Sequence, residues 1–152
     1  YAKVWAEVYG LETVSLRYFN VYGPGQDPNG AYALVIGKFL KLRKEGKPLT
    51  ITGTGKQSRD FTHVSDVVRA NIFASTSKKV GKGEVINIGA GRDFSIKKVA
   101  ELIGGKIEYM PARLEPQKTL ADRRLAKKLL GWEPRVKFED GIVELKKCVK
   151  ME

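Results

Sequence analysis

Stretches typical of β-strands alternate with stretches typical of helices along most of this 152-residue chain. The strand-like stretches are short and rich in β-branched and aromatic residues, while the helix-like stretches carry apolar residues three and four positions apart. We expect strands at 13–19, 49–52, 61–64, 84–88 and 106–109, and helices at 1–9, 32–43, 65–76, 96–103, 122–130 and 138–149. This alternation predicts an α/β protein, and the short strands argue against a complete doubly wound sheet.

Five residues outside the candidate site carry expectations of their own. Ser65 is expected to cap the helix that follows it, whose inward face would carry Val68 and Ile72. The one histidine, His63, has no partners at a spacing that supports a catalytic triad, so we interpret it as structural. The one cysteine, Cys148, excludes a disulfide framework and is expected to pack in the core.

The composition excludes several classes of function. Lys and Arg number 28 against 17 Asp and Glu, but the basic residues are interleaved with acidic ones, so we expect no nucleic-acid groove. No run of about 18 apolar residues exists, which excludes a membrane-spanning helix. One His and one Cys do not make the usual multi-ligand metal site. A cytoplasmic protein that binds a small ligand remains.

The segment LRYFNVYGPGQ at 16–26 runs from the end of a predicted strand into a loop rich in Gly and Pro. Such strand ends are where α/β proteins usually bind ligands. Asn20 can donate and accept hydrogen bonds there, and the alternative is that it only caps the strand. The segment therefore predicts one wall of a ligand site.

Two further segments supply charge. Arg59 has the planar fork that suits a phosphate, and its alternative is a surface pair with Asp60. Arg113 and Glu115 follow a later strand. A nucleoside diphosphate needs about two cations, and a ribose diol suits a carboxylate acceptor. Arg59 and Arg113 would together satisfy the diphosphate, with Glu115 on a hydroxyl; in isolation, Arg113 is more often simply solvated.

Four segments in this order resemble the C-terminal half of the extended short-chain dehydrogenase/reductases. They are LRYFNVYGPGQ at 16–26, LTITGTGKQSRDFTHVSDVVRA at 49–70, VINIGAGRDFSIKKVAELI at 85–103 and ADRRLAKKLLGWEP at 121–134. Within that family the chain is most similar to the NAD-dependent UDP-glucose (or UDP-N-acetylglucosamine) 4-epimerases. The resemblance implies that residues 1–30 form the end of a Rossmann-type domain. It also implies that residues 31–152 form a nucleotide-sugar-binding domain, from which segments return to the sheet.

The resemblance also implies roles for individual residues. Arg59 and Arg113 match two arginines that clamp the substrate diphosphate, Asn20 the asparagine that touches it, and Glu115 the acidic residue on the uridine ribose. Tyr18 resembles the tyrosine near the nicotinamide of NAD. The uracil would lie against the segment Leu34-Val35 and beside two strand threonines, Thr50 and Thr52. No catalytic residue and no metal ligand is assigned to this chain.

Two hallmarks of the family are absent from this sequence. Gly89-Ala90-Gly91 and Gly53-Thr54-Gly55 both lack the third glycine of a dinucleotide fingerprint, so we interpret the first as a structural junction. None of the six tyrosines has Lys four residues later. We therefore expect the substrate-binding half of a longer enzyme, inactive by itself. Its partners would be a UDP-sugar and a missing N-terminal half or complementary chain, with a homodimer possible in the parent. The alternatives are a dehydratase or decarboxylase and a non-catalytic nucleotide-sugar-binding protein.

Overall fold

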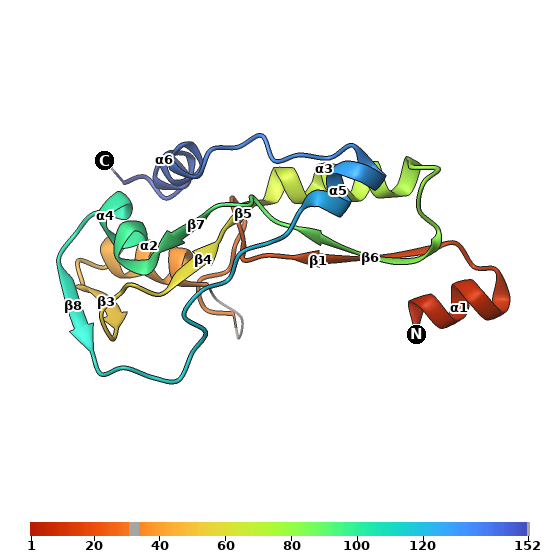
Figure 1. Ribbon diagram of the computed structural model, residues 1–152. Helices are drawn as coiled ribbons and strands as arrows, with labels where there is room; N and C mark the ends of the chain where they lie inside the picture. The colour runs from red at the N-terminus through yellow and green to blue at the C-terminus, as the bar shows by residue number, and fades with distance from the viewer. Residues whose placement is uncertain (31–33, 152) are drawn as a thin grey trace.

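The structure is a computed structural model that describes residues 1–30 and 34–151. Its helices are α1 (Ala2–Tyr9), α2 (Val35–Lys44), α3 (Val64–Thr76), α4 (Ile96–Ile103), α5 (Arg124–Leu130) and α6 (Phe138–Cys148). Its strands are β1 (Thr13–Tyr18), β2 (Val21–Tyr22), β3 (Leu49–Thr52), β4 (Ser58–Asp60), β5 (Thr62–His63), β6 (Lys82–Ile88), β7 (Asp93–Ser95) and β8 (Ile107–Met110). These elements confirm the expected α/β class. Figure 1 shows them in two parts that lie end to end.

The first part, called the sheet part below, consists of α1, β1, α3, β6 and α5. β1 and β6 pair in parallel, with Tyr18 opposite Ile88. Figure 1 shows α3 and α5 above these two strands and α1 below them. The buried core on the α3 and α5 side consists of Val67, Ala70, Ala74, Ile86, Ile88, Ala126, Leu130 and Trp132. On the other side, no residue of α1 is buried, and its apolar residues Val4, Trp5 and Val8 are exposed.

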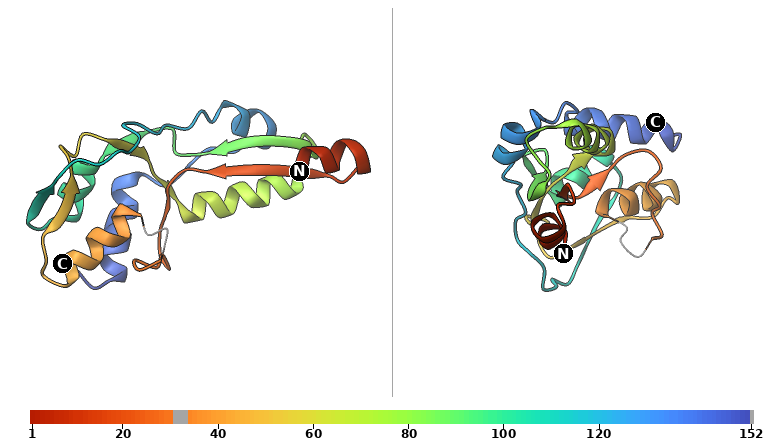
Figure 2. Two further views of the ribbon diagram at one scale, coloured as in Figure 1. Left: turned by 90° about the horizontal axis from the view of Figure 1, so that it is seen from below. Right: turned by 90° about the vertical axis from the view of Figure 1, so that its right-hand side faces the viewer.

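The second part, called the lobe, consists of α2, β3, β4, β7, α4, β8 and α6, and the short parallel pair β2–β5 lies where the two parts meet. β3 pairs with β8 in parallel, and β4 with β7 antiparallel. Both views in Figure 2 show α2 and α6 close together at one side of the lobe. Aromatic rings fill its centre: Phe138 stacks on Phe94 and on Phe61, with centroid distances of 4.3 and 5.2 Å. Stacked contacts of this kind stabilise the core beyond the area that each ring buries.

A buried carboxylate joins the lobe to the sheet part. Asp60, at the end of β4, accepts hydrogen bonds from the backbone N–H groups of Ala90 (2.8 Å), Gly91 (2.9 Å) and Ala121 (3.0 Å). Burial raises the pKa of Asp60, and the three backbone donors act in the opposite direction. A Cβ atom on Gly89 would lie 2.2 Å from Ala121 Cβ, so this close approach requires glycine. The 89–91 segment is therefore a structural junction, as expected from its sequence.

Most predicted elements form within a residue or two of their expected bounds, and α4 has the bounds expected for it. Ser95 Oγ accepts from Lys98 N at 3.1 Å and caps that helix. The expected strand at 61–64 is instead β5 followed directly by α3. Tyr32, the expected first residue of the second helix, lies outside the described residues. None of the helices in the part of the chain that the structure describes is long and apolar enough to cross a lipid bilayer.

Two expectations about α3 are wrong. The helix is capped by His63, whose Nδ1 accepts from Ser65 N, rather than by Ser65. Val68 and Ile72 are 52% and 54% exposed, and the buried face carries Val67, Ala70 and Ala74 instead. The small alanine side chains let α3 lie close to the strands, so the helix presents its second apolar face outward. His63 itself is buried and structural, as expected.

Candidate functional site

A cavity of about 280 Å³ opens in the lobe between the start of α2, β3, β4 and the segment after β8. It is lined by Asn20, Leu34, Val35, Lys38, Phe39, Thr50, Thr52, Gln57, Arg59, Phe61, Ile96, Arg113 and Glu115. All eight residues that the sequence suggested for substrate binding border this one cavity. We call it the nucleotide cavity below, after the ligand that the sequence led us to expect.

Asn20 reaches the cavity from the turn that follows β1. Its backbone has φ of 36°, in the left-handed region that Asn tolerates better than most residues. Its side-chain Nδ2 donates to the backbone oxygen of Asp60 at 2.7 Å and lies 3.4 Å from Thr119 Oγ1. Asn20 therefore has the local structural role considered for it and also borders the cavity, so the two interpretations do not exclude each other.

The charged centre of the cavity is a carboxylate between two guanidinium groups. Arg59 Nη2 donates to Glu115 Oε2 at 2.8 Å, and the two side chains are only 13% and 18% exposed. Arg113 Nε lies 3.6 Å from Glu115 Oε1, but the Arg113 side chain is 68% exposed. The alternative of a surface pair between Arg59 and Asp60 is wrong, because the Asp60 carboxylate is buried and accepts hydrogen bonds from three backbone N–H groups. Both guanidinium groups thus reach a single anion, as a diphosphate clamp requires.

Two polar residues at the cavity were missed in the sequence. Lys38 lies one helical turn after Leu34 on α2 and adds a third cation, a position that the i, i+4 spacing could have revealed. Gln57 is buried, and its Nε2 donates to Thr52 O at 2.9 Å and approaches Glu115 Oε1 at 3.5 Å. Gln57 therefore links the strand that carries Thr52 to the charged centre.

Tyr18 lies apart from the nucleotide cavity. Its ring is 47% exposed at the carboxyl end of β1, and its hydroxyl donates to Asn71 Oδ1 at 2.9 Å. Ligands of open α/β sheets bind beyond this end of the strands, so the position suits a contact with a cofactor. The N–H groups of Ala90 and Gly91 are already bonded to Asp60. Among the described residues, the Gly89–Gly91 turn therefore offers no free cradle for a pyrophosphate.

The fold is α/β of the Rossmann type, and two arginines and a glutamate meet at one cavity of the lobe. Residues 1–89 match the model of the NAD dependent epimerase/dehydratase family. Because this match covers more than half of the chain, the chain belongs to that family.

Relatives of known name agree with this assignment. A UDP-glucuronate 4-epimerase from Thermodesulfobacterium geofontis is 40% identical over 89% of this chain and 42% of its own length. A putative UDP-glucose 4-epimerase from Methanocaldococcus jannaschii is 37% identical over 93% of this chain and 47% of its own length. A UDP-N-acetyl-alpha-D-glucosaminuronate decarboxylase from Bacillus cytotoxicus is 37% identical over 89% of this chain and 45% of its own length. The chain thus spans about half the length of these relatives.

Solved structures show the same fold. An epimerase from Methanothermobacter thermautotrophicus has a TM-score of 0.92 at 30% identity, over 99% of this chain and 46% of its own. The UDP-glucose 4-epimerase of Thermotoga maritima with UDP-glucose has a TM-score of 0.87 at 37% identity, over 97% of this chain and 49% of its own. A UDP-glucuronic acid 4-epimerase from Bacillus cereus, with UDP-glucuronic acid and NAD, has a TM-score of 0.87 at 35% identity, over 98% and 48%.

Proposed function

We propose that this chain is the substrate-binding portion of an NAD-dependent nucleotide-sugar epimerase of the UDP-glucose/UDP-galactose 4-epimerase type. The observation that carries the proposal is the charge around the nucleotide cavity. Lys38, Arg59 and Arg113 border it together with one carboxylate, Glu115, which leaves a net charge of two positive units. A nucleoside diphosphate sugar carries one negative charge on each of its two phosphates at neutral pH, so its diphosphate matches this balance.

The geometry supports a separate role for each residue that borders the nucleotide cavity. Arg59, held by Ser58 O and Glu115, would grip the diphosphate in a fixed orientation, and the more exposed Arg113 would close over it. Asn20 would contact the same group from the opposite wall. Glu115 would then exchange part of its pairing with arginine for a ribose hydroxyl, while the uracil lies against Leu34, Val35, Thr50 and Thr52 at the far end.

NAD would supply the redox chemistry of the proposed reaction, which is reversible hydride transfer at the sugar C4 by way of a transient 4-keto sugar. The described residues of this chain bind and orient the nucleotide so that the sugar extends toward the carboxyl end of β1, where Tyr18 lies. Holding the sugar in one orientation supplies much of the rate gain available to such a reaction.

We further propose that an N-terminal half, on the same or a complementary chain, covers the sheet part. Three exposed surfaces support this. β1 has β6 on one side, and no other described strand pairs with its second edge. α1 exposes Val4, Trp5 and Val8, and α3 exposes Val68 and Ile72. Apolar faces and an open parallel edge of this kind are usually covered in α/β proteins. A homodimer of the parent enzyme remains a prediction.

One alternative is favoured by a specific observation. The match to a UDP-N-acetyl-alpha-D-glucosaminuronate decarboxylase covers 89% of this chain at 37% identity, so a decarboxylase or dehydratase parent would use the same cavity. Combining the chain with an N-terminal half from an epimerase relative would separate the two. Release of carbon dioxide from a UDP-uronate would favour the decarboxylase, and interconversion of UDP-glucose and UDP-galactose the epimerase. A chain that binds UDP-sugar but never gains activity would support a non-catalytic binding protein.

Isothermal titration calorimetry with UDP and uridine tests the binding role directly. We expect UDP to bind and uridine to bind far more weakly, because uridine lacks the diphosphate that the arginines hold. The Arg59→Ala variant should lose UDP affinity, whereas Arg92→Ala, an exposed arginine outside the cavity, should not. Equal binding of UDP and uridine by the folded chain would refute the assignment.

A further inference from the structure

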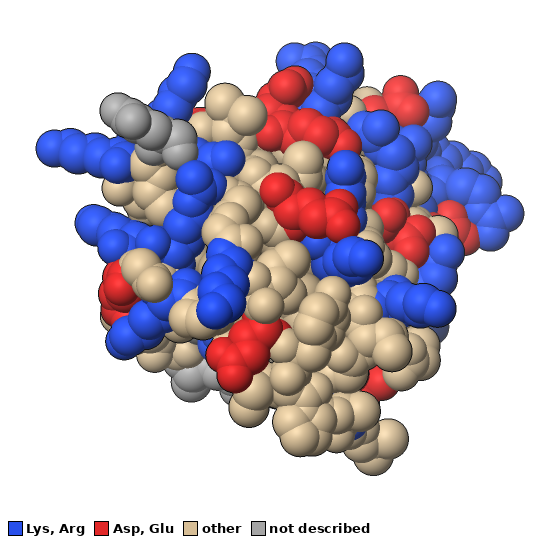
Figure 3. All heavy atoms as spheres, turned by 90° about the vertical axis from the view of Figure 1, so that its left-hand side faces the viewer, with Lys and Arg blue, Asp and Glu red and all other residues tan. Residues whose placement is uncertain are grey.

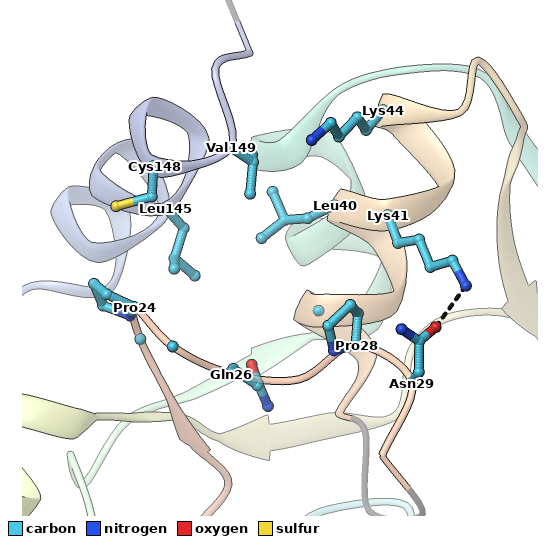
Figure 4. Close-up of a pocket in the computed structure, with 13 residues that line it drawn as sticks. Pro24, Gln26, Pro28, Asn29, Leu40, Lys41, Lys44, Leu145, Cys148 and Val149 are labelled. Atoms are coloured by element: carbon cyan, nitrogen blue, oxygen red, sulfur yellow. Dashed lines mark hydrogen bonds between the residues drawn. The ribbon is translucent and has the colours of Figure 1, made fainter.

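A second cavity, of about 320 Å³, lies on the other side of α2 (Figure 4). Its walls come from the loop at 23–29, the later turns of α2 and the last turn of α6. The residues of α2 that border it, Gly37, Leu40, Lys41 and Lys44, alternate with those that border the nucleotide cavity. The two cavities therefore lie on opposite faces of one helix and are separate sites.

The walls of the second cavity are apolar, and its rim is basic. Figure 4 shows Pro24, Pro28, Leu40, Leu145 and Val149 around the hollow. A volume near 300 Å³ is at the lower end of the range for small-molecule pockets, and such pockets combine apolar walls with a few polar groups. The cavity therefore suits a small molecule with an apolar body.

The polar groups come from Gln26 and Asn29 in the loop and from Lys41 and Lys44 on α2. Lys41 turns away from the hollow and donates to Asn29 Oδ1 at 2.6 Å. Lys44 extends toward Val149 across the mouth in Figure 4, and within residues 1–30 and 34–151 it has no ion-pair partner. The +11 formal charge of the chain adds to the attraction for an anion, and Figure 3 shows Lys and Arg side chains spread over the upper part of the face seen there, with Asp and Glu between them. The end of a ligand nearest Lys44 should therefore be negatively charged.

We propose that this second cavity binds a small monocarboxylate with an apolar tail. The tail lies among the prolines and the α6 side chains, and the carboxylate meets the Lys44 ammonium at the mouth. This proposal goes beyond the nucleotide-binding role and does not depend on it, because none of its residues borders the nucleotide cavity.

The single cysteine gives this site its own reporter. Cys148 borders the cavity and is exposed at the end of α6, so the expectation that it packs in the core is wrong. Because the chain has no other cysteine, the rate at which the neutral reagent 4,4′-dithiodipyridine modifies the protein reports on this position alone. Binding at another apolar surface, such as α1, leaves that rate unchanged.

The experiment compares octanoate with octanol, which share a tail and differ in the charge of the head group. We expect octanoate to slow modification of Cys148 saturably, and octanol to need a concentration about fivefold higher for the same protection, which is what one exposed ion pair supplies. The Lys44→Gln variant should bring octanoate to the level of octanol. The Lys147→Gln variant removes a charge beside the cysteine but outside the cavity, and it should keep the difference.

Several results would overturn the proposal. Glutathione in place of the protein controls for direct effects on the reagent, and circular dichroism checks that each variant is folded. Equal protection by octanoate and octanol would show that Lys44 does not bind the carboxylate of the ligand. If octanoate and octanol protected the Lys147→Gln variant equally, the overall positive charge of the protein, and not Lys44, would attract the carboxylate. Protection by UDP would place the nucleotide in this cavity, and absence of any protection would mean that the cavity binds no such ligand.

Discussion

The two arginines of the nucleotide cavity should contribute unequally to binding, and the structure gives the order. Arg59 is 13% exposed and held on two sides, so its bond to a phosphate is a charged hydrogen bond shielded from water. Its loss should cost about 1.5–3 kcal/mol, or roughly 10- to 150-fold in the Kd for UDP. Arg113 is 68% exposed, so its loss should cost about 0.2–1 kcal/mol, roughly fivefold at most.

Calorimetric titration of UDP into the Arg59→Ala, Arg113→Ala and Arg92→Ala variants at one ionic strength measures both values. The Arg59 variant also leaves Glu115 with one guanidinium partner in place of two, which adds repulsion toward the diphosphate in the same direction. The reasoning is refuted if Arg113→Ala loses as much affinity as Arg59→Ala in folded protein, because burial would then not control the strength of these contacts.

Three further predictions concern stability and pH. The Asp60→Asn variant should unfold about 1–3 kcal/mol more easily in chemical denaturation, because its amide group replaces an acceptor of a backbone N–H. The Gly141→Ala variant should lose about 1–3 kcal/mol, because the new Cβ would lie 2.4 Å from the Tyr22 hydroxyl. Hydrogen bonding to Arg124 lowers the pKa of Asp122 to about 2, so its small contribution to stability is full above its unfolded pKa and is lost as the pH falls through about 2. An NMR titration should show that pKa return toward its ordinary value in Arg124→Ala.

Each of these predictions has a result that would contradict it. Val143→Ala on α6 changes an exposed side chain and should have little effect, so an equal loss in both α6 variants would contradict the packing argument. An Asp60→Asn variant as stable as the parent would mean that the three backbone donors find other acceptors. A low pKa of Asp122 that persists without the Arg124 side chain would point to a different cause.

The candidate site was more predictable from sequence than the packing around it. Asn20 and Arg113 follow short strands and Arg59 lies within one, and ligands of α/β folds bind beyond the strand ends, so these residues meet although they are far apart in the sequence. Lys38 and Gln57 escaped notice because a single sequence does not show which side of α2 or of a turn will face a ligand. The roles of the eight residues remain predictions, although they border one cavity.

The errors share a physical cause. α3 is apolar on two sides, and periodicity alone cannot choose between a face with Val68 and Ile72 and a face with Val67, Ala70 and Ala74. The choice depends on how closely the strands approach, which is a tertiary property. Cys148 was misplaced for a similar reason, because the last turn of α6 lies beside a hollow instead of a neighbouring element.

The position of Asp60 next to Arg59 has a mechanical consequence. The carboxylate fastens three distant stretches of chain at one point, and the adjacent residue carries the guanidinium proposed to hold the phosphates. Arg59, which would hold the ligand, is therefore the direct neighbour in sequence of the residue that joins the lobe to the sheet part. A substitution that weakens the hydrogen bonds to Asp60 should therefore make the position of the Arg59 guanidinium less well defined, even if no group bordering the nucleotide cavity is altered.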